Sequence, residues 1–180
     1  MNKEASYPCI PLAALFAALG LVFPVLFHLT GLGSAFLPMF LPILMGSMLL
    51  PLQLAISIAV LTPVISFVFT GMPPLYPPVL PVMIAELLII SAIASSLHFR
   101  RNLSVWLTLS LALGTDRLFL LLIVYWIAPY MGLPGAFTSG AAVLHGIPGI
   151  VFMFIVIPFS LNILESKYPQ IIERRIRSGK

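Results

Sequence analysis

Apolar residues dominate the chain from Ile10 to Leu164, in long runs that short glycine-rich, proline-rich or basic connectors interrupt. Most runs reach the length of about 20 residues that a helix needs to cross a bilayer. They predict helices at residues 10–29, 36–50, 52–69, 79–97, 104–128 and 140–164, followed by a polar tail at 165–180. The alternating segments of roughly ten residues that build a membrane β-barrel are absent from the sequence. The pattern therefore predicts one domain, an all-α integral membrane protein with six transmembrane helices.

The connector from Thr70 to Pro78 contains four prolines in nine residues. Because proline lacks a backbone N–H and fixes φ, this stretch is expected to form a stiff loop rather than a helix. Gly71 is expected to end the preceding helix, since glycine readily adopts the left-handed conformation found at helix ends. Two further prolines, Pro38 and Pro42, are expected to unwind the start of the second helix. Irregular backbone at membrane depth is tolerated only against protein or a cavity, so we expect a cavity wall there.

The composition excludes a soluble domain. Hydrophobic residues make up 61% of the chain and charged residues only 8%, against roughly 25% charged in average soluble proteins. The first apolar run has a weakly charged start and leads into further membrane segments, so we expect it to be retained rather than cleaved as a signal peptide. The single cysteine, Cys9, cannot form an internal disulfide.

Lysine and arginine residues lie at the two ends of the chain and in the connector from His98 to Asn102, with Arg117 as the exception. Positively charged segments tend to stay on the cytoplasmic side of a membrane. Six helices place both termini and this connector on one side, so the charges predict that both termini are cytoplasmic. We expect no nucleic-acid partner, although the basic tail is expected to attract anionic headgroups of the lipid bilayer.

Three charged side chains fall inside predicted helices: Glu86, Asp116 and Arg117. Each costs roughly 2.5–3.5 kcal/mol at the bilayer centre, so all three are expected to face the bundle interior. Neighbours on a helix point about 100° apart, and we therefore expect Asp116 and Arg117 not to pair with each other. Glu86 is the expected partner of Arg117, and His145 is a possible partner of Asp116. The three groups either form a structural ion pair or line a polar cavity that holds a small solute.

The sequence contains no His, Cys and carboxylate cluster at metal-ligand spacing. It also contains no Gly-x-Ser-x-Gly, P-loop or Gly-x-Gly-x-x-Gly motif. We expect no enzyme activity, no catalytic residue, no cofactor and no metal. A solute moved uphill would draw its energy from a partner or from an ion gradient.

Two overlapping pairs of small residues occur in the first helix, Ala13 with Ala17 and Ala14 with Ala18. At helical spacing, such pairs form a smooth stripe that another helix can approach closely. That second helix belongs either to a partner protein or to this same chain.

Several short motifs occur in order along the chain: Phe36-Leu37-Pro38-Met39-x-x-Pro42, Thr70-Gly71-Met72-Pro73-Pro74, Glu86-Leu87, and Gly146-Ile147-Pro148-Gly149-Ile150 followed by Ile157-Pro158. In order and spacing, from the first helix to the sixth, they resemble the substrate-binding S components of energy-coupling factor (ECF) transporters. The resemblance implies a vitamin-binding subunit in the cell membrane of a prokaryote. It also implies docking on a membrane scaffold subunit that carries two cytoplasmic ATPase subunits.

The resemblance implies a docking stripe on the first helix at Ala13, Ala14, Ala17 and Ala18. It implies a substrate site near the outer face, to which Asp116 is added because it is a charged residue inside a predicted helix. The candidate site residues are Met39, Phe40, Met72, Tyr76, Glu86, Asp116, Arg117 and His145. Phe40 stands where relatives often carry histidine, and this departure implies a less polar or differently anchored solute.

Two other functions fit the same six helices. One is a non-transport membrane scaffold of the cell-shape type, in which the buried charges only lock helices together. The other is a self-sufficient ion-coupled carrier, although no inverted repeat is apparent in the sequence.

Overall fold

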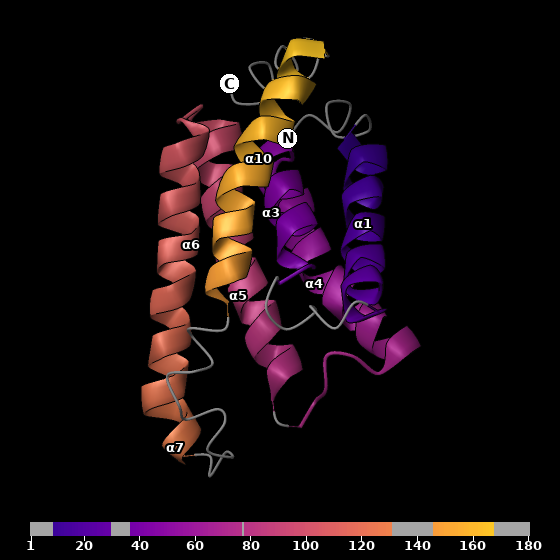
Figure 1. Ribbon diagram of the computed structural model, residues 1–180, viewed down its shortest axis with the longest axis vertical. Coiled ribbons are helices and arrows are strands. Elements are labelled where there is room, and N and C mark those ends of the chain that lie inside the picture. Colours follow the sequence, from indigo (N-terminus) through magenta and orange to yellow (C-terminus); the bar gives the residue numbers. More distant parts are fainter. Residues whose placement is uncertain (1–8, 30–36, 77, 131–145, 168–180) are drawn as a thin grey trace.

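The computed structural model describes residues 9–29, 37–76, 78–130 and 146–167. Within these ranges the chain forms helices and turns and contains no strand, which confirms the all-α prediction (Figure 1). Five helical stretches are long and apolar enough to cross a membrane, and α3 is a shorter apolar helix. In chain order the elements are α1 (Ile10–Leu29), α3 (Phe40–Leu49), α4 (Leu52–Thr70), α5 (Val79–Ala94), η3 (Ser95–Arg100), α6 (Val105–Leu122), η4 (Ile123–Ile127), α7 (Ala128–Tyr130) and α10 (Ile147–Lys167).

The proline- and glycine-containing connectors set where several helices begin and end. α3 begins at Phe40, four residues later than predicted, because Leu37 has a positive φ of 48° and the chain turns at Pro38. The Phe40 N–H donates to the Leu37 carbonyl at 2.9 Å across this turn. At the other end of α4, Gly71 has a φ of 71° and its N–H donates to the Phe67 carbonyl at 2.8 Å. The prediction that Gly71 ends this helix is confirmed.

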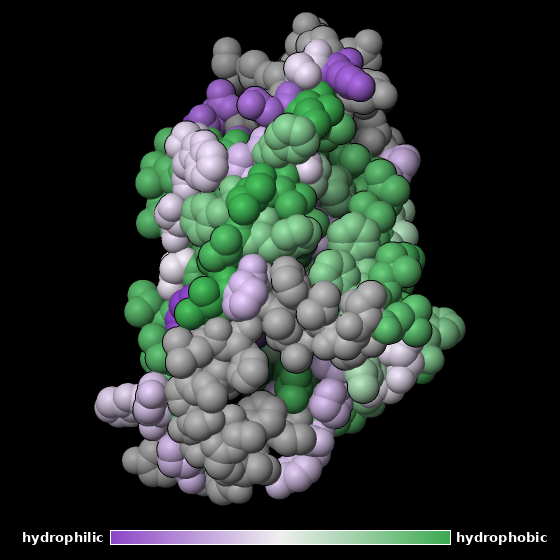
Figure 2. All heavy atoms as spheres, viewed as in Figure 1, coloured by the Kyte–Doolittle hydropathy of each residue, from purple (hydrophilic) through white to green (hydrophobic). Residues whose placement is uncertain are grey.

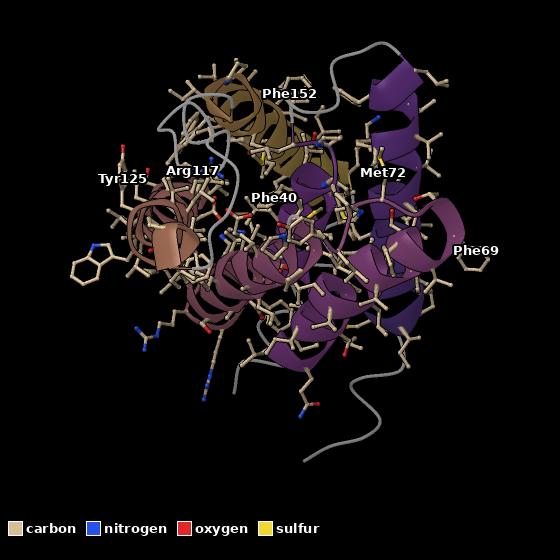
Figure 3. The ribbon with its side chains drawn as sticks, turned by 90° about the horizontal axis from the view of Figure 1, so that it is seen from below. Phe40, Phe69, Met72, Arg117, Tyr125 and Phe152 are labelled. Atoms are coloured by element: carbon tan, nitrogen blue, oxygen red, sulfur yellow. The ribbon has the colours of Figure 1, made fainter. Side chains whose placement is uncertain are left out.

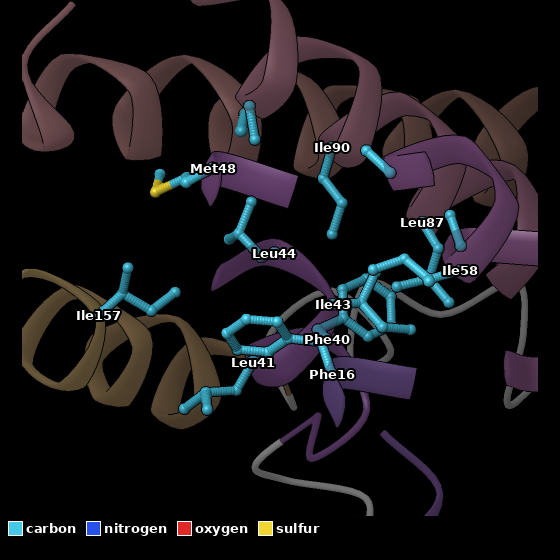
Figure 4. Packing of buried hydrophobic residues seen from close by; sticks show 14 of the residues in the cluster. Phe16, Phe40, Leu41, Ile43, Leu44, Met48, Ile58, Leu87, Ile90 and Ile157 are labelled. Atoms are coloured by element: carbon cyan, nitrogen blue, oxygen red, sulfur yellow. The ribbon is translucent and has the colours of Figure 1, made fainter. Parts of the chain in front are cut away.

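The short helix α3 is buried on almost every side. It packs against α1, α4, α5 and α10, so it forms the centre of the bundle (Figures 1 and 4). The large side chains Ile43, Leu44 and Met48 are fully buried there. Ser47 is also buried, and its hydroxyl donates to the Ile43 carbonyl at 2.7 Å, which satisfies the one polar group that it brings into this core.

The π-helical segment η3 continues α5 and carries it to the connector before α6. The Ser95 hydroxyl donates to the Leu50 carbonyl at 2.8 Å. Leu50 lies in the short connection between α3 and α4. His98 Nδ1 lies 2.8 Å from the Leu103 carbonyl oxygen and closes the connector. Ser104 then caps α6 by accepting a hydrogen bond from the Leu107 N–H. These contacts tie the basic connector to the central helix.

Charge separates the two ends of the molecule. α1 begins and α10 ends at the same end as the connector between η3 and α6, whereas the loop after α4 lies at the opposite end (Figure 1). Exposed Arg100, Arg101 and Lys167 belong to the first end. Figure 2 shows most of the strongly hydrophilic residues gathered at that end and mainly apolar residues covering the flanks. An apolar flank below a charged end is the surface expected of a protein embedded in lipid.

Candidate functional site

An open pocket of about 650 Å³ lies at the end of the molecule that carries the proline-rich loop. Its walls come from the end of α1, the turn before α3, the end of α4, the loop after α4 and the start of α5. The lining residues are Pro24, Val25, Leu29, Leu37, Pro38, Met39, Phe40, Ser66, Thr70, Met72, Pro73, Pro74, Val79 and Met83. A pocket of this size with mostly apolar walls suits a small organic ligand. The turn around Pro38 therefore borders a cavity, as predicted, whereas Pro42 lies in the first turn of α3 and outside the pocket lining.

The loop beside this pocket is held at both ends by hydrogen bonds. The Thr70 hydroxyl donates to the Ser66 carbonyl at 2.7 Å and accepts from the Met72 N–H at 3.3 Å. At the far end, the Leu80 N–H donates to the Pro74 carbonyl at 3.1 Å. The prolines and these bonds together position the loop with few free torsions.

Three of the predicted site residues line the pocket, namely Met39, Phe40 and Met72. Met39 and Phe40 are buried in the core, and Met72 is half exposed. Figure 3 shows Phe40 near the middle of the bundle and Met72 beside α1. Tyr76 is 76% exposed and lies outside the pocket lining, so it offers its ring to the surroundings rather than to the cavity.

Glu86 lies deeper along the helix face that borders the pocket. Val79 and Met83 line the pocket, and Glu86 follows them by seven and three residues on α5, which places it on the same face. Its side chain is buried, with 7% of the residue exposed. Among the described residues, Glu86 Oε1 has no hydrogen-bond partner. One carboxyl oxygen of Glu86 is thus held in the bundle interior without a donor from the described part of the chain.

Asp116 and Arg117 form an ion pair with each other. Arg117 Nε and Nη2 both donate to Asp116 Oδ2, at 3.0 and 2.6 Å. The prediction that these neighbours cannot pair was wrong, because the arginine side chain is long enough for its fork of donors to bend back across the angle between the two positions. Across the described helices, no salt bridge joins the expected partners Glu86 and Arg117.

A glycine makes room for the guanidinium group. A β-carbon at Gly146 would stand 2.6 Å from Arg117 Nη1 and 3.3 Å from Leu37 Cδ1. Leu37 also lines the pocket, so the ion pair lies one side chain away from it. Glu86 is close enough for the charges of both Asp116 and Arg117 to act on it. The three charged groups therefore form one cluster beside the inner part of the pocket.

The two alanine pairs of α1 face different surroundings. Ala13 is buried in the core and Ala17 packs against it, whereas Ala14 and Ala18 are exposed. The first pair therefore serves packing within this chain. The second pair lies on the outer face of α1, where a partner helix has access.

Several pocket residues were not predicted from the sequence. The apolar residues at the end of α1 resemble any other lipid-facing positions in their pattern. Val79 and Met83 carried a usable signal, because they share a helix face with Glu86. His145, the remaining predicted site residue, lies outside the described residues. The described side chains include no group of three or more His, Cys, Asp or Glu residues that could hold a metal ion.

Compared with known proteins, the chain matches no family model, no curated protein and no solved structure. Its function is therefore inferred from its own features: the pocket, the buried charged cluster and the exposed face of α1. These features are suited to binding a small molecule and contacting another helix.

Proposed function

We propose that this protein is the substrate-capture subunit of an ECF-type transporter and that it imports a vitamin or vitamin precursor into a prokaryotic cell. The observation that carries the proposal is the pocket of about 650 Å³ between the anchored loop and the buried helix α3. A preformed, largely apolar pocket with a few polar groups nearby is the usual way in which proteins hold small organic ligands.

The proposal includes six transmembrane helices, with α3 as the short second one, and cytoplasmic termini in the plasma membrane. The positive charges of Arg100, Arg101 and Lys167 at one end of the bundle support this orientation. With that end in the cytoplasm, the pocket opens toward the outside, where an importer meets its substrate.

Energy would come from partner subunits, because the sequence carries no nucleotide-binding motif. A membrane scaffold subunit with two cytoplasmic ATPases would supply it. The exposed pair Ala14 and Ala18 supports close approach of a scaffold helix to α1. After capture, a toppling or rocking movement of the whole bundle would deliver the substrate.

A thermal-shift experiment tests capture. Purified protein is heated with a panel of vitamins and precursors. A tight ligand increases the free energy of unfolding by mass action, by about 2.7 kcal/mol at 100 times its Kd, and so raises the melting temperature. Compounds that remain bound through purification are identified by mass spectrometry. If no compound stabilises the protein and none remains bound, the chain is not a capture subunit.

An uptake experiment separates the proposal from the two rivals. Uptake of the stabilising vitamin is expected only when the scaffold and ATPase subunits are present. Uptake into liposomes that contain this chain alone would instead support an ion-coupled carrier. If the protein were a non-transport scaffold, its buried charges would serve to hold different helices together. The ion pair of Asp116 and Arg117 instead joins two neighbours on α6, which does not favour that function.

A further inference from the structure

The charged cluster inside the bundle contains more carboxyl groups than guanidinium groups. Glu86 and Asp116 contribute two carboxylates, and Arg117 contributes one guanidinium. Both ion-pair hydrogen bonds of Arg117 go to Asp116 Oδ2. The positive charge is thus engaged by one carboxylate, and Glu86 is the group left in excess.

The unused oxygens of this cluster are deeply buried. Glu86 is 7% exposed and Asp116 is fully buried, and within the described part of the chain Glu86 Oε1 and Asp116 Oδ1 accept no hydrogen bond. A buried carboxylate oxygen without a donor is strongly unfavourable, more so inside a membrane protein, unless a positive charge or a proton reaches it. The described residues therefore contain two buried carboxyl oxygens that are available as acceptors and have no donor among those residues.

This acceptor site adjoins the pocket through two separate elements. On α5, Met83 lines the pocket and Glu86 lies almost one turn further along the same face. On the other side, Leu37 lines the pocket, and both Leu37 and Arg117 Nη1 lie close to Gly146. A molecule whose apolar body fills the pocket would therefore have its inner end near Glu86.

We propose that the captured molecule is an organic cation, with an apolar or aromatic body between Met39, Phe40 and Met83 and a positively charged nitrogen directed at Glu86. This inference rests on the proposed function and names the chemical class of its substrate. The methionine and phenylalanine side chains suit such a body, since sulfur and aromatic groups contact flat rings favourably. An anionic substrate would meet the second carboxyl group instead of a free arginine, because Arg117 is engaged by Asp116.

The experiment compares charge classes on the unaltered protein. Thiamine, a permanent cation, is paired with its neutral oxidation product thiochrome, and the anion biotin and the neutral compound riboflavin are added. The natural compound extracted from the purified protein is identified in parallel, and its charge at pH 7 is read from its structure. We expect the extracted compound to be cationic and cationic probes to raise the melting temperature more than neutral or anionic ones.

A variant assigns the effect to Glu86. Glu86→Gln is expected to weaken binding of the stabilising cation by about thirtyfold or more, the loss typical when one partner of a buried charge pair is removed. Glu165→Gln, at the third residue from the C-terminal end of the 21-residue helix α10, is the matched control, expected to bind like the unaltered protein.

Three results would overturn the inference. A neutral or anionic compound that stabilises the unaltered protein and Glu86→Gln equally would exclude a cationic substrate while leaving vitamin capture intact. Stabilisation by sodium chloride but not by N-methyl-D-glucamine chloride or organic probes, lost in Glu86→Gln, would assign the site to an inorganic ion. If no charge class stabilises the protein, both this inference and the proposed function fail.

Discussion

Gly46 on α3 lies directly against the side chain of Phe16 on α1. A β-carbon at Gly46 would stand 2.7 Å from Phe16 Cγ and 2.8 Å from Phe16 Cβ. These Phe16 atoms are next to its backbone, so a rotamer change cannot move both of them away. The contact therefore sets the spacing between α1 and the central helix.

Gly46→Ala is expected to destabilise the protein by roughly 1–3 kcal/mol, because the added methyl group forces α1 and α3 apart. Thermal unfolding of the purified protein in detergent measures this change. Gly114→Ala on α6 is the matched control, since a β-carbon there meets no atom within 4 Å. It is expected to leave stability unchanged or raise it by about 0.5–1 kcal/mol. Equal melting temperatures for both variants would contradict the tight α1–α3 contact.

Removing Asp116 and removing Glu86 are expected to change the stability of the unliganded protein in opposite directions. Asp116→Asn leaves the guanidinium of Arg117 without its carboxylate and is expected to cost roughly 3–5 kcal/mol. Glu86→Gln removes a buried carboxyl group whose Oε1 has no donor among the described residues, and it is expected to raise the melting temperature. The two variants are compared by thermal unfolding in the absence of added compounds. A large destabilisation by Glu86→Gln would show that Glu86 has a structural partner.

The outer face of α1 is expected to tolerate larger residues in the isolated protein but not in the complete transporter. Ala18→Leu should change the stability by no more than about 0.5 kcal/mol, because Ala18 is exposed. It should reduce co-purification with the scaffold subunit, since the added side chain blocks close helix approach. Ala13→Leu is the contrasting variant, expected to lose roughly 1–3 kcal/mol through overpacking of the core. Unchanged co-purification of Ala18→Leu would exclude this face as the docking surface.

The pocket is expected to be blocked by a larger side chain on its wall. Met83→Trp replaces a partly buried lining residue with a bulky ring and should abolish stabilisation by the vitamin that protects the unaltered protein. Tyr76→Trp is the control, because Tyr76 is exposed and lies outside the lining. The thermal shift of each variant is measured at the same vitamin concentration. A full shift in Met83→Trp would mean that the vitamin binds elsewhere.

The sequence predicted the elements well, because long apolar runs and their breakers are local signals. Gly71 and Pro38 each act on the backbone within a few residues of themselves, so the helix end and the unwound start of the second helix followed directly. Which side of α1 faces the core could not be predicted in this way. Its alanine pairs and its flanking residues are all apolar, so no change in polarity marks which side faces the core.

The candidate site was harder to predict than the helices, because it depends on how far side chains extend and on how segments distant in the sequence come together. The pairing of Asp116 with Arg117 follows from the length of the arginine side chain, which the angle between helix positions does not capture. The pocket collects residues from α1, α4 and α5, and no short motif encodes that meeting. Phe40 and Met72 were found because they belong to motifs beside the prolines, and Met83 was missed because it does not.

The uneven charge of the two ends restricts how the bundle can lean within the bilayer. The loop after α4, at the pocket end, contains no Lys, Arg, Asp or Glu, so no charged side chain holds it at the level of the lipid phosphates. Arg100, Arg101 and Lys167 remain at the level of the lipid phosphates. If the bundle tilts, its basic end stays near the lipid phosphates and acts as the pivot. The mouth of the pocket, at the opposite end, then moves through the larger distance.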